Sequence, residues 1–363
     1  MRILITGACG VTSRAVARSL RHSARLSQLQ LVGTDICDNP YGLFEGFYDR
    51  IYRAPRVSDT DYRRWMEDLC RAERLDAAIV IPELEVLYWS AVGFPIPALL
   101  PPETFCRIAV NKGTLYEALA GRDLVPRFRI YSRAELMAAD PLAASDLPCW
   151  IRDFSEGTSC GKGSLLAHNA HEVHAWILLN PGIDHFMVSE YLPGRNFACH
   201  LLYDQGTIVK IACYERIEYF MARTVMSGIS GNISKGRLMN DERLVARSQT
   251  AIAAILARTG ETMRGLVAVD FREAANGTPM ITEINLRHVA ATYSFAAAGF
   301  NLAEAHLLLT LGRPDELGPL EMTFPEHNMI LRDIDGAPIW VAHYRELMVG
   351  ESVDRPPAPQ STM

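Results

Sequence analysis

Three oxygen-bearing side chains stand at strand spacing in the C-terminal half of the chain. Asp270 lies in one apolar run, and Glu283 and Asn285 follow in the next. Side chains alternate between the two faces of a strand, so Glu283 and Asn285 share a face that Asp270 can reach from a neighbouring strand. Such oxygens are the ligands that Mg²⁺ prefers, and Mn²⁺ accepts the same set. The pattern predicts a metal site, with a solvated strand face as the alternative.

A basic side chain follows on the same side of this predicted strand. Arg287 lies two positions beyond Asn285, where its charge can neutralise a phosphate or acyl-phosphate bound to the metal. Three polar residues come next and are open to two interpretations, either lining a substrate site or packing in the core. They are His288, Tyr293 and Ser294.

A glycine-rich segment at 155–164 contains three glycines and four hydroxyl-bearing side chains. Backbone N–H groups and hydroxyls of such a loop can wrap polyphosphate oxygens, and Arg152 in the preceding strand can clamp a phosphate with two hydrogen bonds. The spacing differs from that of a P-loop, and a hairpin without a ligand is the alternative. The loop residues expected to bind phosphate are Gly157, Ser159, Gly161, Lys162 and Gly163.

A shorter glycine loop follows the first predicted strand. Gly7 and Gly10 precede a helical pattern, and Asp35 ends the second strand, where a dinucleotide-binding fold carries a ribose-binding acid. The spacing differs from Gly-x-Gly-x-x-Gly. A tight structural turn is therefore favoured, and a nicotinamide-dependent oxidoreductase is the alternative from another functional class.

Composition excludes several classes of partner. The 363 residues carry a formal net charge of −6, which argues against nucleic-acid binding over a broad surface. The longest uncharged stretch, 86–102, contains four prolines, so no membrane-spanning helix is expected. The eight cysteines occur without a Cys-x-x-Cys pair, which is typical of reduced thiols in a cytoplasmic protein.

Hydrophobic periodicity predicts the elements that position these residues. Apolar runs at 2–6, 29–34 and 77–81 indicate buried strands, and helical spacing at 13–21 and 61–74 places helices between them. Strands that alternate with helices form a parallel α/β sheet. The chain beyond residue 110 is predicted to be mixed α+β. Its expected helices and strands lie at 113–120, 127–131, 149–154, 186–189, 197–203, 207–214, 241–258, 265–271 and 279–285.

Five features in this order resemble motifs of the ATP-grasp superfamily, especially its carboxylate–amine ligase and carbamoyl-phosphate-synthase-like branch. They are the segments 3–10 and 81–85, similar to the preceding domain; Asn-Lys at 111–112; Arg152 with the loop 157–163; the hinge Val-Ser-Glu-Tyr-Leu-Pro-Gly at 188–194; and the triad Asp270, Glu283 and Asn285. The resemblance covers most of the chain.

The resemblance implies a role in ATP binding for several residues. Lys112 and Arg152 would hold the α- and β-phosphates. Glu190, Tyr191 and Leu192 would bind adenine, mainly through backbone groups. Asn196 occupies a position where many relatives carry a ribose-binding acid, and its amide can still form hydrogen bonds.

The resemblance also implies a catalytic arrangement. The triad would bind one or two Mg²⁺ ions, and an arginine in a closing loop would contact the γ-phosphate and the acceptor. Arg216 is expected in that role, ahead of Arg223 and Lys235, with solvated surface charge as the alternative. Arg287 would assist.

The activity that the resemblance implies is ATP-dependent ligation. A small-molecule carboxylate would be activated as an acyl-phosphate and joined to an amine, releasing ADP and phosphate. A carbamoyl- or carboxy-phosphate-forming enzyme and a nucleotide-binding protein without turnover remain alternatives.

The implied organisation is a Rossmann-like pre-ATP-grasp domain at 1–108 followed by a two-lobed ATP-grasp fold. The small lobe with its flap would span 109–190, the large lobe with the metal site 191–350, and a disordered tail 351–363. An amphipathic helix at 302–311 is expected to pack in the core or in a homodimer.

Overall fold

Strands and helices alternate at the N-terminus, and strands dominate afterwards. The computed structural model describes residues 1–26, 28–138, 142–143, 146–154, 164–223, 228, 231–333 and 346–354. Its strands are β1 (Arg2–Thr6), β2 (Gln30–Asp35), β3 (Arg50–Arg53), β4 (Ala77–Ile79), β5 (Phe128–Ser132), β6 (Cys149–Asp153), β7 (Leu165–Ala167), β8 (His185–Glu190), β9 (Asn196–Asp204), β10 (Thr207–Tyr219), β11 (Ile233–Met239), β12 (Gly265–Glu273), β13 (Pro279–Asn285), β14 (Ile330–Leu331) and β15 (Ser352–Asp354). Its α-helices are α1 (Val11–Arg21), α2 (Tyr41–Phe44), α3 (Tyr62–Glu73), α4 (Glu83–Val92), α5 (Glu103–Val110), α6 (Lys112–Leu119), α7 (Arg133–Leu136), α8 (Ala170–Leu179), α9 (Glu242–Thr259), α10 (Thr292–Ala297) and α11 (Leu302–Thr310).

The N-terminal sheet is parallel in its first four strands; the periodicity predicts β1, β2 and β4, whereas β3 was not predicted. Its order is β15-β3-β2-β1-β4, and the pairs β1–β2, β2–β3 and β1–β4 are parallel. Ile3 and Ile5 pack with residues of α1 and α11, whereas Leu4 packs with residues of α3 and α4. Alternating side chains therefore bury both faces of this sheet.

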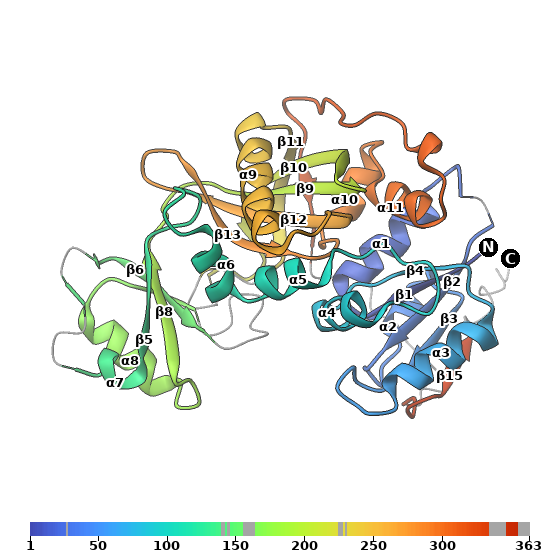
Figure 1. Cartoon of the computed structure of the whole chain (residues 1–363), viewed down its shortest axis with the longest axis horizontal. Coiled ribbons are helices and arrows are strands. Elements are labelled where there is room, and N and C mark those ends of the chain that lie inside the picture. The colour runs from blue at the N-terminus through green and yellow to red at the C-terminus, as the bar shows by residue number, and fades with distance from the viewer. Residues whose placement is uncertain are drawn as a thin grey trace, which may run out of the picture.

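An antiparallel sheet in the order β13-β12-β9-β10-β11-β14 occupies the centre of the molecule (Figure 1). Helix α9 covers one face, where Ile252 packs with Leu201 of β9. Helix α10 covers part of the other face, where Phe295 packs with Tyr214 and Ala268. The strand register places Asp270 on this second face, beside the area that α10 covers.

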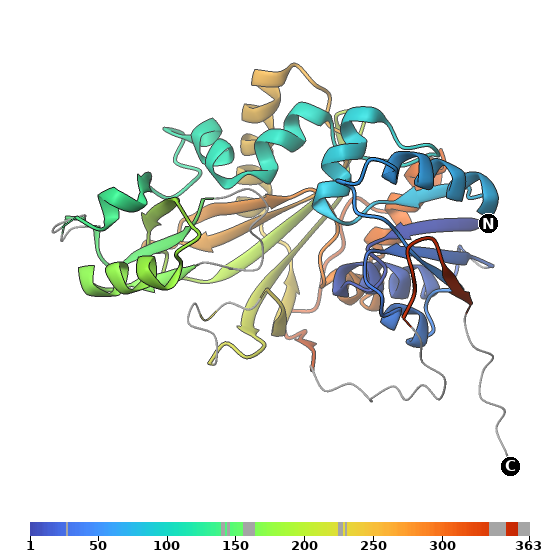
Figure 2. The same cartoon turned by 90° about the horizontal axis from the view of Figure 1, so that it is seen from below.

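A smaller antiparallel sheet in the order β5-β8-β6-β7 lies at the end of the molecule opposite the N-terminal sheet (Figures 1 and 2). Helices α7 and α8 pack on one of its faces. Helix α7 begins at the predicted capping box, in which Ser132 and Glu135 each accept a hydrogen bond from the other's backbone N–H. The other face is left for the cavity described below.

Two C-terminal segments return to the N-terminal sheet. Ala303, Leu307 and Leu308 of α11 are buried in its core, so the helix predicted for core or subunit packing is used in the core. The prediction of a disordered tail from residue 351 is wrong for β15, which pairs antiparallel with β3. A three-residue strand is too short to show periodicity, and the partner strand alone defines it.

The helices of the described residues include none that is long and apolar enough to cross a membrane. The cysteines in the described ranges are free thiols, as their spacing predicts: Cys9, Cys37, Cys70, Cys106, Cys149, Cys199 and Cys213.

Candidate active site

The hairpin of β12 and β13 brings together the three side chains predicted as metal ligands. In its register Asp270 pairs with Glu283, and Asn285 pairs with Ala268 on the same face. Nδ2 of Asn285 lies 3.4 Å from Oδ2 of Asp270 and 3.3 Å from Oε1 of Glu283. The polar ends of the three side chains therefore converge.

Burial and neighbouring charges set the protonation of the two carboxylates. Burial raises the pKa of Asp270 against the lowering effect of Arg216, and the charge of Glu283 raises it further. Burial alone would also raise the pKa of Glu283, but Lys112, a hydrogen bond with Asp270 and the charge of Arg152 lower it below its usual range. In the absence of a cation, a proton on Asp270 relieves the repulsion within the pair.

This donor set fits a hard divalent cation. Two carboxylate oxygens face the amide, and a half-turn of the Asn285 amide presents Oδ1 in place of Nδ2. Among the described residues there is no group of three or more His, Cys, Asp or Glu side chains that could hold a metal ion. A cation at this point would be held by Asp270, Glu283 and Asn285, with phosphate or water oxygens completing its coordination.

Arg216 of β10 is fixed beside the carboxylate pair. Its Nη2 lies 2.6 Å from Oδ1 of Asp270. Its Nε donates to the hydroxyl of Tyr214 at 2.9 Å, and its Nη1 donates to the carbonyl of Phe197 at 3.3 Å. The guanidinium thus has an ordered position at the site and leaves Oδ2 of Asp270 facing Asn285.

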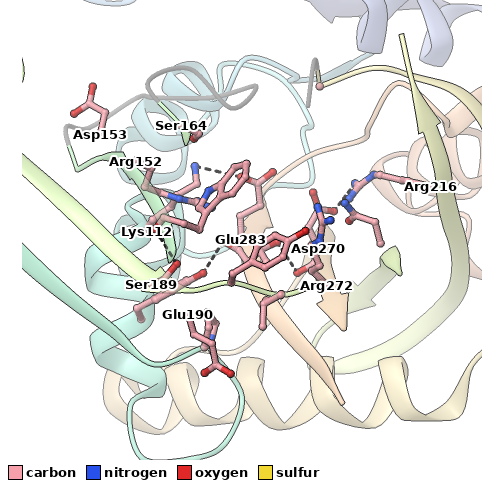
Figure 3. A pocket seen from close by; sticks show the side chains of 18 of the residues that line it. Lys112, Arg152, Asp153, Ser164, Ser189, Glu190, Arg216, Asp270, Arg272 and Glu283 are labelled. Atoms are coloured by element: carbon pink, nitrogen blue, oxygen red, sulfur yellow. Dashed lines mark hydrogen bonds and ion pairs between the residues drawn. The ribbon is translucent and has the colours of Figure 1, made fainter. Parts of the chain in front are cut away.

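Lys112 reaches Glu283 from the opposite side of the cavity (Figure 3). It is the first residue of α6, and the side chain of Asn111 caps this helix by accepting from the N–H groups of Gly113 at 2.8 Å and Thr114 at 3.2 Å. Nζ of Lys112 lies 3.2 Å from Oε2 of Glu283. The ammonium and the helix N-terminus together make this wall positive.

Strand β6 contributes two side chains to the cavity wall. Cys149 and Ile151 face the core under α7 and α8, so Trp150 and Arg152 project from the other face. Nε1 of Trp150 and Nε of Arg152 are buried and have no hydrogen-bond partner among the described residues. Buried donors without partners are costly, and here they point to a polar ligand. Trp150 was missed in the sequence, although its spacing from Arg152 is the signal that finds it.

The segment that follows β8 forms another wall. The side chain of Glu190 lies 3.2 Å from Nε of Arg127, and its backbone N–H donates to the Arg127 carbonyl at 2.9 Å. Figure 3 shows the Glu190 carboxylate turned away from Glu283. Tyr191 and Leu192 come next and line the cavity. Base recognition at this wall would therefore depend on the backbone of Tyr191 and Leu192.

An amide and a guanidinium stand where the resemblance implies a ribose-binding acid. Nδ2 of Asn196 donates to the hydroxyl of Tyr219 at 2.8 Å. Arg272 pairs with Asn196 in the sheet register, and its guanidinium lies 5.9 Å from the ring centre of Tyr191. Its Nε is buried without a partner among the described residues. Arg272 was missed as well, although it lies two residues beyond Asp270 on the same strand.

One cavity, shown in Figure 3, collects most of the predicted residues. Those that line it are Lys112, Arg152, Glu190, Tyr191, Leu192, Asn196, Arg216, Asp270 and Glu283. Further lining residues, not predicted, are Tyr116, Pro126, Trp150, Asp153, Ser164, Ser189, Tyr219, Gly231, Arg272 and Thr282. The predicted phosphate loop, with Gly157, Ser159, Gly161, Lys162 and Gly163, lies outside the described residues.

Arg287 does not line this cavity and lies toward the N-terminal sheet. Its Nη2 is 3.9 Å from Oε2 of Glu83 at the start of α4. The next residue, His288, is fully buried, with Nε2 3.0 Å from Nδ1 of His306. Burial lowers the pKa of His288 well below its usual value. His288 therefore packs in the core, whereas Arg287 connects the β13 segment with the N-terminal sheet.

The first glycine loop is held by its own hydrogen bonds. Asp35 accepts from the N–H groups of Cys9 at 2.8 Å and Cys37 at 2.9 Å, one on each carboxylate oxygen. Gly7 has a φ of +64°, and a Cβ there would lie 2.8 Å from Pro82. These contacts favour the structural turn over a ribose site.

Comparisons with known proteins identify the fold. No protein-family model and no curated protein matches the chain. Among solved structures, an L-amino acid ligase from Bacillus licheniformis matches 88% of this chain and 75% of its own, with a TM-score of 0.59 and 16% identity. An ADP complex of N5-carboxyaminoimidazole ribonucleotide synthetase matches 89% of this chain and 79% of its own, with a TM-score of 0.62 and 15% identity.

A third similar structure is an ATP complex of D-alanine–D-alanine ligase from Bacillus anthracis. It matches 88% of this chain and 100% of its own, with a TM-score of 0.54 and 13% identity. The chain has the ATP-grasp fold. The cavity lies between the four-stranded and six-stranded sheets, which contribute Arg152 and Asp270 respectively.

Proposed function

We propose that this chain is an ADP-forming ligase that uses ATP to join a small-molecule carboxylate to an amine. The observation that carries the proposal is the convergence of Lys112, Asp270 and Glu283 in one cavity of an ATP-grasp fold. Two of the similar structures are complexes with ADP and with ATP.

ATP binds in the cavity between the two sheets. Lys112 and Arg152 hold the α- and β-phosphates, so that the buried Nε of Arg152 gains an acceptor. Backbone groups of Tyr191 and Leu192 bind adenine, and Asn196 contacts the ribose.

Asp270, Glu283 and Asn285 would hold one or two Mg²⁺ ions, which would supply charge neutralisation for the polyphosphate. Arg216 neutralises charge on the transferred phosphoryl group. Arg287, which lies outside the lining of the cavity and 3.9 Å from Glu83, contacts the activated acid from the side of the N-terminal sheet. Phosphoryl transfer depends on positioning and electrostatic stabilisation, so the reaction needs no side-chain nucleophile.

The reaction has two steps. A carboxylate oxygen of the substrate attacks the γ-phosphorus, the bond between the β- and γ-phosphates breaks, and ADP leaves. The amine then attacks the acyl carbon, a C–N bond forms, the acyl C–O bond breaks, and phosphate leaves as the amine loses a proton.

We also propose that residues 1–108 are a Rossmann-like pre-ATP-grasp domain, 109–190 the small lobe and 191–350 the large lobe. The parallel strand order β3-β2-β1-β4 supports the first assignment. Helix α11 and strand β15 complete the N-terminal sheet from later parts of the chain.

The test is a product analysis with ATP, Mg²⁺ and pairs drawn from a panel of carboxylates and amines. We expect ADP and phosphate in equal amounts only when both substrates are present. AMP with pyrophosphate, or no nucleotide turnover with any pair, contradicts the proposal. ADP formation that requires only bicarbonate would support a carboxy-phosphate-forming enzyme instead.

A further inference from the structure

Three arginines lie on elements that adjoin helix α10, and none of them lines the proposed ATP site. Arg14 and Arg18 lie about one turn apart on α1, and Arg332 directly follows the edge strand β14. We refer to Arg14, Arg18 and Arg332 as the arginine cluster.

Helix α10 connects the two parts of the arginine cluster. The guanidinium of Arg18 lies 5.3 Å from the ring centre of Tyr293 on α10. Phe295 of the same helix packs in one core with Ile330, two residues before Arg332. Figure 1 shows α10 between α1 and the six-stranded sheet. The cluster is therefore assembled from both sides of one short helix.

Tyr214 lies between the arginine cluster and the metal-ligand set. Its hydroxyl accepts from Arg216, which pairs with Asp270. Its ring belongs to the same core as Ile330. In the sheet register Gly236 separates Arg216 from Ile330. The cluster thus borders the same face of the sheet that carries the carboxylates, near the edge strand two strands from Arg216.

Positive charge in the arginine cluster exceeds the nearby negative charge. Glu45 lies 2.7 Å from Nη1 of Arg14 and 3.8 Å from Nη2 of Arg18. Within the described ranges Arg332 has no ion pair, and its Nη1 is buried without a hydrogen-bond partner. Burial lowers the pKa of Arg332 against a raising effect of Tyr214, and the charges of Arg18 and Arg14 lower it further. Glu45 thus pairs with two of the three guanidinium groups, and the third, that of Arg332, lies over the ring of Phe220, 5.8 Å from its centre.

Arg332 is half-buried, and a half-buried guanidinium without a counter-charge lowers stability, a cost that a bound anion removes. Guanidinium groups bind carboxylates and phosphates through paired hydrogen bonds. We infer that the acid substrate carries a second anionic group, a carboxylate or a phosphate, which the arginine cluster binds while the reacting carboxylate faces the metal-ligand set. This inference rests on the proposed function.

Calorimetric titration with three probes tests the inference. Succinate carries two carboxylates, phosphoglycolate a carboxylate and a phosphate, and butyrate one carboxylate on a chain as long as that of succinate. The protein is saturated with Mg²⁺ and the ATP analogue AMP-PNP, so that the nucleotide site is filled. The variants are Arg332→Gln and Arg18→Gln. The control is Arg64→Gln, because the Arg64 side chain is 88% exposed on α3.

We expect succinate or phosphoglycolate to bind at least about tenfold more tightly than butyrate. One additional hydrogen bond between charged groups is enough for a difference of this size. The probe that binds more tightly identifies the second group as a carboxylate or a phosphate. Both cluster variants lose the preference, and Arg64→Gln keeps it. Equal binding of the three probes, no binding of any probe, or a preference that survives in both variants overturns the inference.

The same proteins separate this inference from the proposed function. Failure of AMP-PNP to bind contradicts the proposed function. Titration of the probes without nucleotide then still decides whether the arginine cluster prefers molecules with two anionic groups. Thermal unfolding of the ligand-free proteins adds a second readout. Arg332→Gln removes a half-buried charge that has no ion pair among the described residues, so its melting temperature is not lower than that of the wild type. A lower melting temperature with unchanged probe preference indicates a structural role and overturns the inference.

Discussion

Glu283 lies where the two halves of the cavity meet. One of its carboxylate oxygens contacts Lys112 of α6. The other lies near the Asn285 amide nitrogen, which also lies near Asp270. Positive charge around it holds its pKa below the usual range despite burial. An ionised carboxylate in this position can serve both the metal and the lysine, which makes Glu283 the most informative residue to change.

Glu283→Gln keeps the size of the side chain and removes its charge. We expect turnover to fall on the order of 10²-fold or more, because a lost metal ligand weakens the stabilisation of charge in the transition state. The rate of ADP release measures the effect. Glu67→Gln on α3 is the matched control and keeps wild-type turnover. Glu283→Gln activity within about twofold of wild type would show that the triad is misassigned.

Glu85 is a buried carboxylate away from the candidate site, located in the first turn of α4. Burial raises its pKa to about 7 from an ordinary value of 4.5, against hydrogen bonds from Thr6 and Tyr62 that lower it. The folded protein therefore keeps this carboxyl protonated over a pH range in which the unfolded chain ionises it. This difference makes stability depend on pH.

The contribution of Glu85 to the free energy of unfolding is fully present below pH 4.5. It is lost as the pH rises toward about 7. The shift corresponds to about 3 kcal/mol. Glu85→Gln cannot ionise, so the variant should gain stability relative to wild type as the pH rises. Urea unfolding at about pH 5 and about pH 8 measures the free energy of unfolding. The same pH dependence in both proteins would contradict a raised pKa.

At the scale of elements, helix α6 positions Lys112 through its cap. Asn111→Ala removes the two hydrogen bonds to Gly113 and Thr114, which should cost about 1 kcal/mol and loosen the first turn. We therefore expect a lower melting temperature together with weaker ATP binding. Asn111→Ser restores an acceptor and should recover both properties. Unchanged ATP affinity in Asn111→Ala would show that the helix cap does not determine the position of Lys112.

The alternation of side chains between the two faces of a strand could be predicted from the sequence. This alternation correctly places Asp270, Glu283 and Asn285 on one face of the sheet. The same rule finds Arg272 and Trp150 once it is applied to every residue beside a predicted ligand. The contact between Asp270 and Arg216 could not be predicted in this way. It depends on the order β12-β9-β10, which arises from pairing between distant segments.

At the scale of the whole molecule, the N-terminal sheet is completed by segments that come last in the chain. The packing of α11 residues Ala303 and Leu307 on this sheet could not be read from local periodicity, which predicts an apolar face without naming its partner. The arginine cluster has the same origin, because helix α10 contacts Arg18 of α1 and packs with Ile330, two residues before Arg332.

Nucleotide binding should stabilise the entire fold, since the cavity joins two sheets. A ligand at a hundredfold excess over its Kd stabilises the folded state by about 2.7 kcal/mol. We expect AMP-PNP with Mg²⁺ to raise the melting temperature, and EDTA to remove most of the increase because Asp270 and Glu283 repel a polyphosphate without a cation. An equally large increase in EDTA would contradict the proposed metal role.

Transfer of the γ-phosphoryl group to a substrate carboxylate is the step on which the proposed function depends. The most direct measurement uses the active substrate pair with ¹⁸O in the reacting carboxylate and follows the released phosphate by mass spectrometry. The acyl-phosphate route predicts that each phosphate carries one ¹⁸O atom from the acid, because the acyl C–O bond breaks in the second step. Released phosphate without ¹⁸O would contradict it.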